Sequence, residues 1–553
     1  MKRLIIILMA MLPMLFVAKA ETIQVDSVGK LATLLPDSTR FTIADLTISG
    51  PLNGADLKVL QQIVTRTKTN KKNLNECIVL SLDLSDATIV GGKDGINTMD
   101  NELPSSLLKG AKLLTKCVLP KTVTVIGDSF FENCEALSDI TIPETVKEIG
   151  NGAFEDCQSL TAIQLPTGLT ELDNNAFEGC KSLTTITIPD GVKKLGNDAF
   201  KDCKSLQTIQ LPANLSEIGS GTFKGCEVLD NVAIPESLSE IGSDAFAGCT
   251  ALNKIQLTKI QKIGNGAFEN CKSLEEVAFE RINKLSNNAF ENCTSLKSVS
   301  IQGSLSEIGE DAFKGCTSLT EVTLPSSLKE LGNEAFAACK SLEAIQLPDA
   351  LAKISSKAFM GCASLRQAII PTMVKSIGSS AFEGCSSLDS VAINGFITEI
   401  ESSLFRECHN LRTVSIPNTV KKIGSKAFLE CSSLAAIQLP IALTSIGDDA
   451  FQHCTALNEI KLPVAVKEIG GSAFEECVML SLVDLPPSLK KIGGSAFAKC
   501  TSLREVILNS PAPPSISKST FKNSNPTYII PRGSLPVYIS NKDWKHITGY
   551  REK

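Results

Sequence analysis

The motif Phe-x-x-Cys occurs seventeen times between residues 131 and 500. Successive copies lie 23 residues apart, except for two steps of 22 that join Cys249, Cys271 and Cys293. A fixed period of this length is typical of solenoids, in which each repeat buries its apolar side only by stacking on its neighbours. The sequence therefore predicts one long repeat domain with a cap at each end rather than several globular domains.

One representative repeat is LTTITIPDGVKKLGNDAFKDC, residues 183–203. Leu183, Ile186 and Ile188 have the spacing L-x-x-I-x-I, whose last two positions alternate as in a strand. We therefore expect these three side chains to point inward. Thr185 and Thr187 should then point outward from the same strand.

The second half of the repeat predicts an exit from the strand and a turn. Pro189 cannot donate a backbone hydrogen bond and should end the strand, and Gly196 stands where a positive φ would suit glycine. Phe200 and Cys203 are three residues apart, as one turn of a short α- or 3₁₀-helix would place them on one side. Each coil should thus contain a strand, a second short extended piece and a helical turn.

The consensus L-x-x-I-x-L-P-x-x-L-x-x-I-G-x-x-A-F-x-x-C resembles the BspA-like class of bacterial leucine-rich repeats. The resemblance implies an α/β-type leucine-rich repeat solenoid, right-handed, with about 17 or 18 coils of 22 or 23 residues over residues 111–510. Members of that class are implicated in attachment to host extracellular proteins or to other cells. The resemblance therefore implies an exported binding scaffold that is not an enzyme and whose partners are proteins.

The two ends of the chain predict caps, which a solenoid needs to cover its core and its strand edges. Residues 21–110 form the expected N-terminal cap, in which Leu57, Leu60 and Val64 have helical spacing. Residues 511–553 form the expected C-terminal cap, whose aromatic residues Tyr528, Tyr538 and Trp544 should cover the last coil.

Residues 1–20 have the pattern of a secretory signal peptide. Two basic residues precede an apolar stretch from Leu4 to Val17, and Ala18-Lys19-Ala20 supplies small residues for cleavage. The apolar stretch is shorter than the roughly 20 residues that a membrane-spanning helix needs. We expect the mature chain to be secreted or held at the cell surface, with a periplasmic location as the alternative.

The formal net charge is −6 over 553 residues. Such a mild overall charge favours neither a nucleic-acid partner nor an anionic membrane surface.

The nineteen cysteines admit three interpretations. Equivalent side chains in a solenoid point the same way, whereas a disulfide needs them to converge. A metal site needs ligands around a point, whereas these thiols follow a line. Buried packing thiols are the favoured interpretation, with some disulfides as the main alternative.

Catalytic residues are scarce. The chain has three histidines, His409, His453 and His546, of which the first two lie at variable positions of ordinary repeats. No partnered serine or cysteine stands at an unusual position, so a triad has no support. We predict no catalytic site, no metal site and no cofactor.

The outward strand positions predict a face for protein binding, rich in small polar residues and glutamine. It lacks the Trp, Tyr and Arg that usually concentrate binding energy, which favours weak contacts over an extended surface or a merely solvated face. The alternative function is a structural or assembly protein of the cell envelope without a host ligand. The candidate residues are Thr185, Thr187, Gln210, Gln256, Thr323, Gln346, Gln438 and Lys461.

An irregular stretch interrupts the period. Three repeats without the exit proline, near Thr258, Arg281 and Gly303, coincide with the two 22-residue steps. This predicts a bend or a specialised patch between residues 250 and 303.

Overall fold

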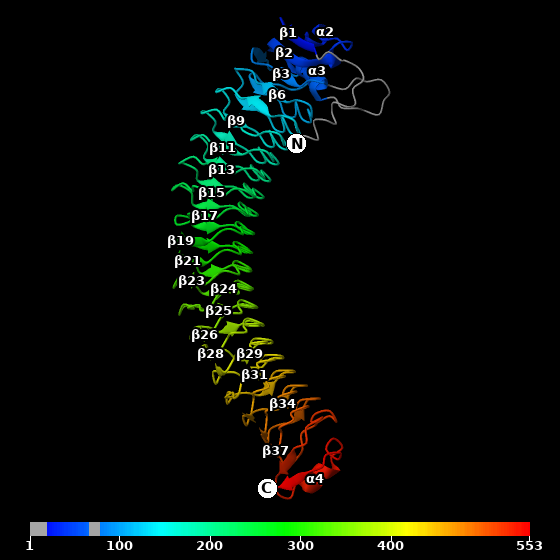
Figure 1. Ribbon diagram of the computed structural model, residues 1–553, viewed down its shortest axis with the longest axis vertical. Helices are drawn as coiled ribbons and strands as arrows, with labels where there is room; N and C mark the ends of the chain where they lie inside the picture. The colour runs from blue at the N-terminus through cyan, green and yellow to red at the C-terminus, as the bar shows by residue number, and fades with distance from the viewer. Residues whose placement is uncertain (1–18, 66–77) are drawn as a thin grey trace, which may run out of the picture. The chain divides into compact units, whose positions relative to one another are not determined.

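The computed structural model describes residues 19–65 and 78–553, which form a first compact unit ending at Leu252 and a second spanning residues 253–553. Within each unit the chain winds into stacked coils, with helices confined to the terminal regions of the chain (Figure 1). Most of the predicted signal peptide, residues 1–18, lies outside the described residues. Lys19 and Ala20 begin strand β1.

The N-terminal cap combines short helices with the first strands. Strands β1, β2, β3, β6 and β8 form a parallel sheet, and β4 pairs with β2. The helix expected from Leu57, Leu60 and Val64 is α3, whose apolar side is buried. The elements before the regular coils are β1 (Lys19–Gln24), α2 (Leu31–Leu34), η1 (Arg40–Thr42), β2 (Ile43–Leu52), α3 (Gly54–Thr65), β3 (Ser81–Asp83) and β4 (Ala87–Ile89).

Asp56 in the first turn of α3 ties this cap together. Its side chain is 1% exposed and accepts backbone hydrogen bonds from Gly29 at 2.6 Å, Leu31 at 2.9 Å and Asn53 at 3.2 Å. We predict that Asp56→Ala lowers the free energy of unfolding by about 2 to 4 kcal/mol, because it leaves buried N–H groups without an acceptor. Urea unfolding checks this, with the change Asp45→Ala at an exposed position as the control. Equal losses of unfolding free energy in the two variants would contradict the prediction.

The first unit carries two rows of parallel strands. The strands before the exit proline form one row and are called the longer strands, since most of them have three or more residues, although β15 has two. Two-residue strands form the other row, in the orders β5-β7-β9-β10 and β12-β14-β16. The longer strands are β6 (Lys116–Val118), β8 (Asp139–Thr141), β11 (Thr185–Thr187), β13 (Thr208–Gln210) and β15 (Asn231–Val232). The short strands are β5 (Glu102–Leu103), β7 (Val125–Ile126), β9 (Glu148–Ile149), β10 (Glu171–Leu172), β12 (Lys194–Leu195), β14 (Glu217–Ile218) and β16 (Glu240–Ile241).

The second unit repeats the same two rows. Its longer strands form the parallel sheets β19-β21-β23, β26-β28-β30 and β33-β35-β37-β38-β39. The longer strands are β17 (Lys254–Ile255), β19 (Glu276–Ile282), β21 (Ser298–Gly303), β23 (Glu321–Thr323), β26 (Gln367–Ile370), β28 (Ser390–Ile393), β30 (Thr413–Ser415), β33 (Glu459–Lys461), β35 (Leu482–Leu485), β37 (Glu505–Leu508), β38 (Thr527–Ile530) and β39 (Tyr550–Glu552). The short strands are β18 (Lys262–Ile263), β20 (Lys284–Leu285), β22 (Glu307–Ile308), β24 (Glu330–Leu331), β25 (Lys353–Ile354), β27 (Ser376–Ile377), β29 (Glu399–Ile400), β31 (Lys422–Ile423), β32 (Ser445–Ile446), β34 (Glu468–Ile469) and β36 (Lys491–Ile492).

Three coils lack the longer strand, so the expectation of a strand in every coil is wrong there. Each of the three has alanine before Ile-Gln-Leu-Pro, at Ala162, Ala344 and Ala436. The coil with Thr208 before the same four residues forms β13. Alanine is depleted in strands and threonine is enriched, which agrees with this difference.

The exit proline limits strand length. Strands β19 and β21, whose coils lack it, have seven and six residues, whereas β11 and β13 have three. Two of the three coils of the irregular stretch thus have longer strands, in which no proline interrupts the ladder of backbone hydrogen bonds. The third, near Thr258, also lacks the proline, but its strand spans only Lys254–Ile255.

The Phe-x-x-Cys segment is a tight turn rather than the expected short helix. Cys203 N–H donates to Phe200 at 3.2 Å, but Asp202, one of the two residues between them, has a φ of 56°. The Phe200 N–H donates to Thr222 of the next coil at 2.8 Å. The backbone therefore hydrogen-bonds from coil to coil on this side as well.

Where glycine stands at the turn before Ala-Phe, it serves close packing and not a positive φ, which corrects the sequence-based reason; Asp173, Ser286, Ser355 and Glu401 hold the same place in other coils. Gly242 does not have a positive φ, but a Cβ on it would lie 2.6 Å from the backbone of Gly219 one coil back. The left-handed residue is instead two positions later, as at Asp244 with a φ of 54°.

The cysteines are free and buried at all eighteen positions that the structure describes. From Cys134 to Cys500, sixteen thiols donate to a backbone carbonyl of the preceding coil at 3.1 to 3.3 Å. In the last coil Ser524 replaces cysteine and donates to Phe497 at 2.8 Å. The thiol therefore acts as a buried hydrogen-bond donor in the packed coil.

Burial raises the pKa of these thiols, that of Cys362 to about 12. In a Cys77→Ser chain we therefore predict almost no reaction of the native thiols with Ellman's reagent at pH 8, because the thiolate is the reactive form. All should react after unfolding in guanidinium chloride. A Thr323→Cys chain supplies one exposed thiol as a positive control, and rapid native reaction of many thiols would contradict the prediction.

The C-terminal cap closes the second unit with aromatic residues. Its helix is α4 (Leu535–Ser540). Tyr538 and Trp544 are fully buried, and Trp544 packs against Phe521, Tyr528 and Tyr538 with ring centroids 6.3, 5.8 and 5.5 Å away. The expected aromatic residues thus lie at the end of the phenylalanine ladder.

Candidate protein-binding face

The outward side chains of the longer strands, together with the equivalent positions beside these strands and in coils without one, form what we call the strand face. In the first unit it carries Thr185, Thr187 and Gln210, all exposed. Strands β11 and β13 place Thr185 opposite Thr208 and Thr187 opposite Gln210. The Thr208 hydroxyl donates to Thr185 at 3.1 Å, and the Thr187 hydroxyl donates to the Gln210 side-chain oxygen at 3.4 Å. These polar groups therefore form a ladder between neighbouring coils.

The other five candidates are also exposed and lie on separate coils of the second unit. Thr323 and Lys461 belong to β23 and β33. Gln256 follows β17, whereas Gln346 and Gln438 lie in coils without a longer strand. The eight candidates are consequently spread along the strand face and do not converge on one cluster.

A trough of about 610 Å³ crosses the strand face over β26, β28 and β30. Its floor follows the short side chains Ala392 and Ser415, and the longer Ile369 and Gln438 stand on either side along the stack. Ile369 is 62% exposed although it occupies an outward strand position. The trough is lined by Gln367, Ala368, Ile369, Ser390, Val391, Ala392, Thr413, Val414, Ser415, Ile416, Asn418, Gln438, Leu439 and Pro440.

Only Gln438 among the eight predicted residues lines this trough. The prediction missed Ile369, Ala392 and Ser415. The available signal was the change in outward residues from Thr and Gln to Ile, Ala and Ser across three successive repeats.

The residues that line the trough can bind a partner through van der Waals contacts and hydrogen bonds. No charged residue lines it, and its polar groups are the amides of Gln367, Asn418 and Gln438 and the hydroxyls of Ser390, Thr413 and Ser415. Amides and hydroxyls can pair with the backbone of a bound protein segment, while Ile369 offers apolar area. The trough holds no nucleophile and base pair of the kind that acyl transfer requires.

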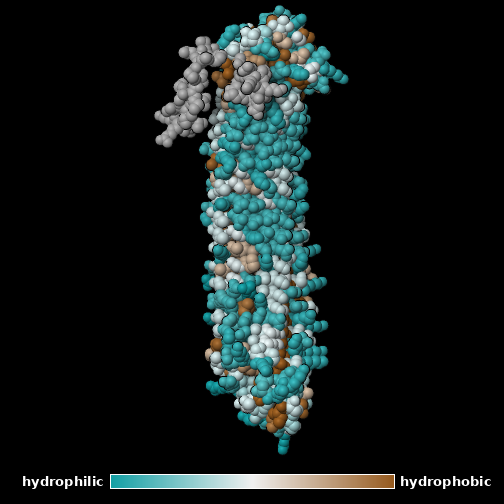
Figure 2. All heavy atoms as spheres, turned by 90° about the vertical axis from the view of Figure 1, so that its right-hand side faces the viewer, coloured by the Kyte–Doolittle hydropathy of each residue, from teal (hydrophilic) through white to brown (hydrophobic). Residues whose placement is uncertain are grey.

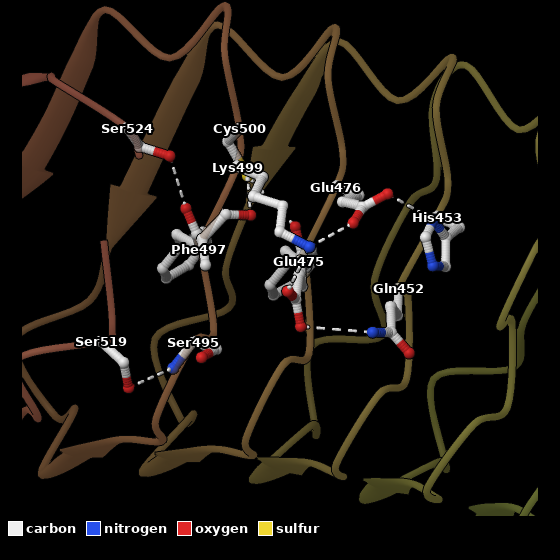
Figure 3. A network of polar contacts seen from close by, with 12 residues as sticks. Gln452, His453, Glu475, Glu476, Ser495, Phe497, Lys499, Cys500, Ser519 and Ser524 are labelled. Carbon is white, nitrogen blue, oxygen red and sulfur yellow. Dashed lines mark hydrogen bonds and ion pairs between the residues drawn. The ribbon is translucent and has the colours of Figure 1, made fainter. Parts of the chain in front are cut away.

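The histidines lie away from the trough in surroundings that give no catalytic arrangement. His453 Nδ1 lies 3.0 Å from the Glu476 carboxylate, and Lys499 bridges Glu476 and Glu475 at 2.5 and 3.2 Å (Figure 3). The hydrogen bond from Lys499 holds the pKa of Glu476 below its ordinary value. This partly exposed network links three successive coils, and such pairs add little to stability.

His546 lines a depression of about 490 Å³ at the C-terminal cap. No carboxylate lines that depression, so no acid–base pair forms around this histidine there. Among residues 19–65 and 78–553, no group of three or more His, Cys, Asp or Glu side chains is arranged to hold a metal ion. No helix in the same part of the chain is long and apolar enough to cross a membrane.

The family model described as the BspA type leucine-rich repeat region matches residues 101–229, 216–342, 306–435 and 421–536. The chain is 26% identical to a leucine-rich repeat protein from Bacteroides ovatus over 84% of this chain and 97% of that chain, with a TM-score of 0.35. It is 24% identical to a leucine rich cell surface protein from Faecalibacterium prausnitzii over 58% and 86% of the two chains, with a TM-score of 0.36. No curated protein matches the chain.

Proposed function

The chain belongs to the BspA-type leucine-rich repeat family, whose solenoids generally serve as protein-binding scaffolds, and we propose that this member is exported and attaches to proteins of the host or of other cells. The main support for this proposal is the uncharged trough over β26, β28 and β30. Exposed apolar area and uncharged amide groups lie together there on the strand face. Such a combination suits a protein segment better than a small charged ligand.

The residues at the signal-like N-terminus support export, and the exposure of all eight strand-face candidates supports contact over an extended surface. The trough is the part of that surface where we expect affinity to be concentrated, because its floor and its flanking side chains can enclose a partner.

We predict that Ala392→Arg weakens binding to a captured partner at least tenfold, because the long side chain fills the floor of the trough. Binding of the immobilised mature chain to purified extracellular matrix proteins, measured by surface plasmon resonance, checks this. The matched control is Ala278→Arg, the same change at an exposed outward position of β19. Equal effects of the two changes, or no binding by the native chain, would contradict the proposal.

Protease treatment of intact cells tests the location separately. A surface attachment protein should be cleaved, whereas protection in intact cells and cleavage after lysis would favour the envelope assembly protein.

A further inference from the structure

Four large apolar side chains protrude from the turns that follow the place of the exit proline in the second unit. These residues, which we call the apolar edge, are Met373, Phe396, Ile441 and Val464, with exposed fractions of 54, 71, 67 and 71%. They occupy the first two positions after the place of the exit proline in their repeats. Side chains this large and this exposed mark interaction surfaces when they gather in one place.

The turns of the apolar edge stack directly on one another. Phe396 N–H donates to Val374 at 2.9 Å, and Ile441 N–H donates to the side chain of Asn418 at 3.4 Å. The Ser488 hydroxyl donates to Val464 at 2.6 Å. The turns therefore stack along the solenoid, with Met373 and Phe396 in two successive coils, Ile441 and Val464 in two later ones, and the coil of Asn418 between the two pairs.

The earlier turns differ from this edge. Across the described residues, no exposed large hydrophobic side chain lies in the equivalent turns between residues 144 and 353. Figure 2 shows hydrophobic residues among the last repeats on the face that it draws. The apolar edge is consequently a local property of the second unit and not a general feature of the repeat.

A column of lysines runs beside the apolar edge. Val374 is buried, whereas its neighbours Met373 and Lys375 are exposed and point outward. Lys421 and Lys467 hold the place of Lys375 in later coils. The backbone N–H groups of Lys375, Lys421 and Lys467 donate to Ala352, Thr398 and Thr444 of the preceding coils at 2.8 or 2.9 Å, so the three lysines of this column stand in alternate coils. In the part of the chain that the structure describes, Lys375, Lys421 and Lys467 have no ion pair.

The charge of these turns is positive although the whole chain is negative. The six turn segments 372–376, 395–399, 418–422, 441–445, 464–468 and 487–491 contain six lysines and two glutamates. The ten equivalent segments between 144 and 353 contain nine basic and ten acidic residues. The overall charge of −6, from which we expected no affinity for an anionic membrane, conceals this local excess of positive charge.

We propose that the apolar edge and its lysine column bind the surface of an anionic lipid membrane. Protruding apolar side chains can enter the boundary between headgroups and acyl chains, while flanking lysines pair with lipid phosphates. A second copy of the chain fits less well, because its own lysine column would face like charge. A single peptide fits less well, because these side chains stand out from the surface and do not line a groove. The edge would hold the exported protein at a membrane surface, and this proposal does not rest on the function of the trough.

Sedimentation with vesicles tests the proposal on the whole mature chain. We expect binding to phosphatidylcholine vesicles that contain phosphatidylglycerol, little binding to phosphatidylcholine alone, and at least a tenfold loss of affinity between 50 and 500 mM NaCl. The triple change Phe396→Ser, Ile441→Ser, Val464→Ser should weaken binding at least tenfold. The triple change Lys375→Gln, Lys421→Gln, Lys467→Gln should do the same.

Two controls lie on other turns of the same unit. Met479→Ser alters an exposed apolar residue in the turn after Cys477, and Lys426→Gln alters an exposed lysine before Phe428. Both should bind as the native chain does. Circular dichroism checks that each variant is folded. If the triple serine variant is unfolded, vesicle binding by the triple glutamine variant alone tests the proposal. Absence of binding to anionic vesicles at 50 mM NaCl, equal binding to both vesicle types, or unchanged binding by both edge variants would overturn the proposal.

Discussion

Phe313→Ala is expected to lower the free energy of unfolding of the second unit by about 3 to 5 kcal/mol and its thermal midpoint by several degrees. The side chain is fully buried. Its ring stacks on Phe290 at 5.5 Å and on Phe336 at 5.3 Å, with interplanar angles of 5° and 11°. Removal of the ring therefore leaves a cavity that opens towards two coils at once.

The cost should be large because a solenoid has no alternative contacts for these coils. Each coil packs only on its two neighbours, so a cavity in one coil weakens both of its interfaces. Stacked coils hydrogen-bonded on three sides also leave little freedom for the cavity to collapse, and incomplete collapse raises the cost of a large-to-small change.

Two control substitutions show whether the loss of stability comes from the burial of the Phe313 side chain. Phe396→Ala removes the same ring from a side chain that is 71% exposed, and Thr323→Ala alters the exposed side of β23. Both should change stability by no more than about 0.5 kcal/mol. Thermal unfolding followed by circular dichroism checks all three chains. If Phe313→Ala and Phe396→Ala lowered the midpoint equally, the phenylalanine ladder would not be the core.

Much of the coil could be predicted from the sequence because its Phe and Cys core positions recur in seventeen repeats. The period fixes which residues stack, so the burial of Phe313 and Cys316 follows from their place in the repeat. The reason for glycine was harder to predict: Gly242 is required by the backbone one coil away, a contact that the residues of its own repeat do not reveal.

The candidate site was less predictable because it depends on differences between repeats. The trough arises where the small Ala392 and Ser415 lie between Ile369 and Gln438, residues that are 23 or more positions apart in the chain. The apolar edge was missed for a related reason. Ile441 and Val464 read as ordinary apolar residues in a repeat that contains many, and only their exposure separates them from core residues such as Leu443.

Trp544→Ala is the second change with a large expected effect, because it opens the end of the core. Trp544 is fully buried and its indole N–H donates to the Pro514 carbonyl at 2.6 Å. We expect a loss of about 3 to 5 kcal/mol in the stability of the cap, with detachment of residues 511–553 from the last coil. Limited proteolysis should then cleave this segment first, and amide exchange in β37 and β38 should accelerate.

The location of the effect distinguishes a cap from an ordinary core residue. Phe521 stacks on Phe497 at 5.5 Å on one side and meets Tyr528 and Trp544 on the other, so loss of the indole exposes the last ring of the ladder to water. Unfolding should consequently begin at this end and shorten the solenoid coil by coil, since each coil depends on its neighbour. Ile539→Ala in α4, where the side chain is 53% exposed, should leave the cap attached. If Trp544→Ala accelerated exchange equally in β19 and β37, the aromatic cluster would stabilise the whole unit and not its end alone.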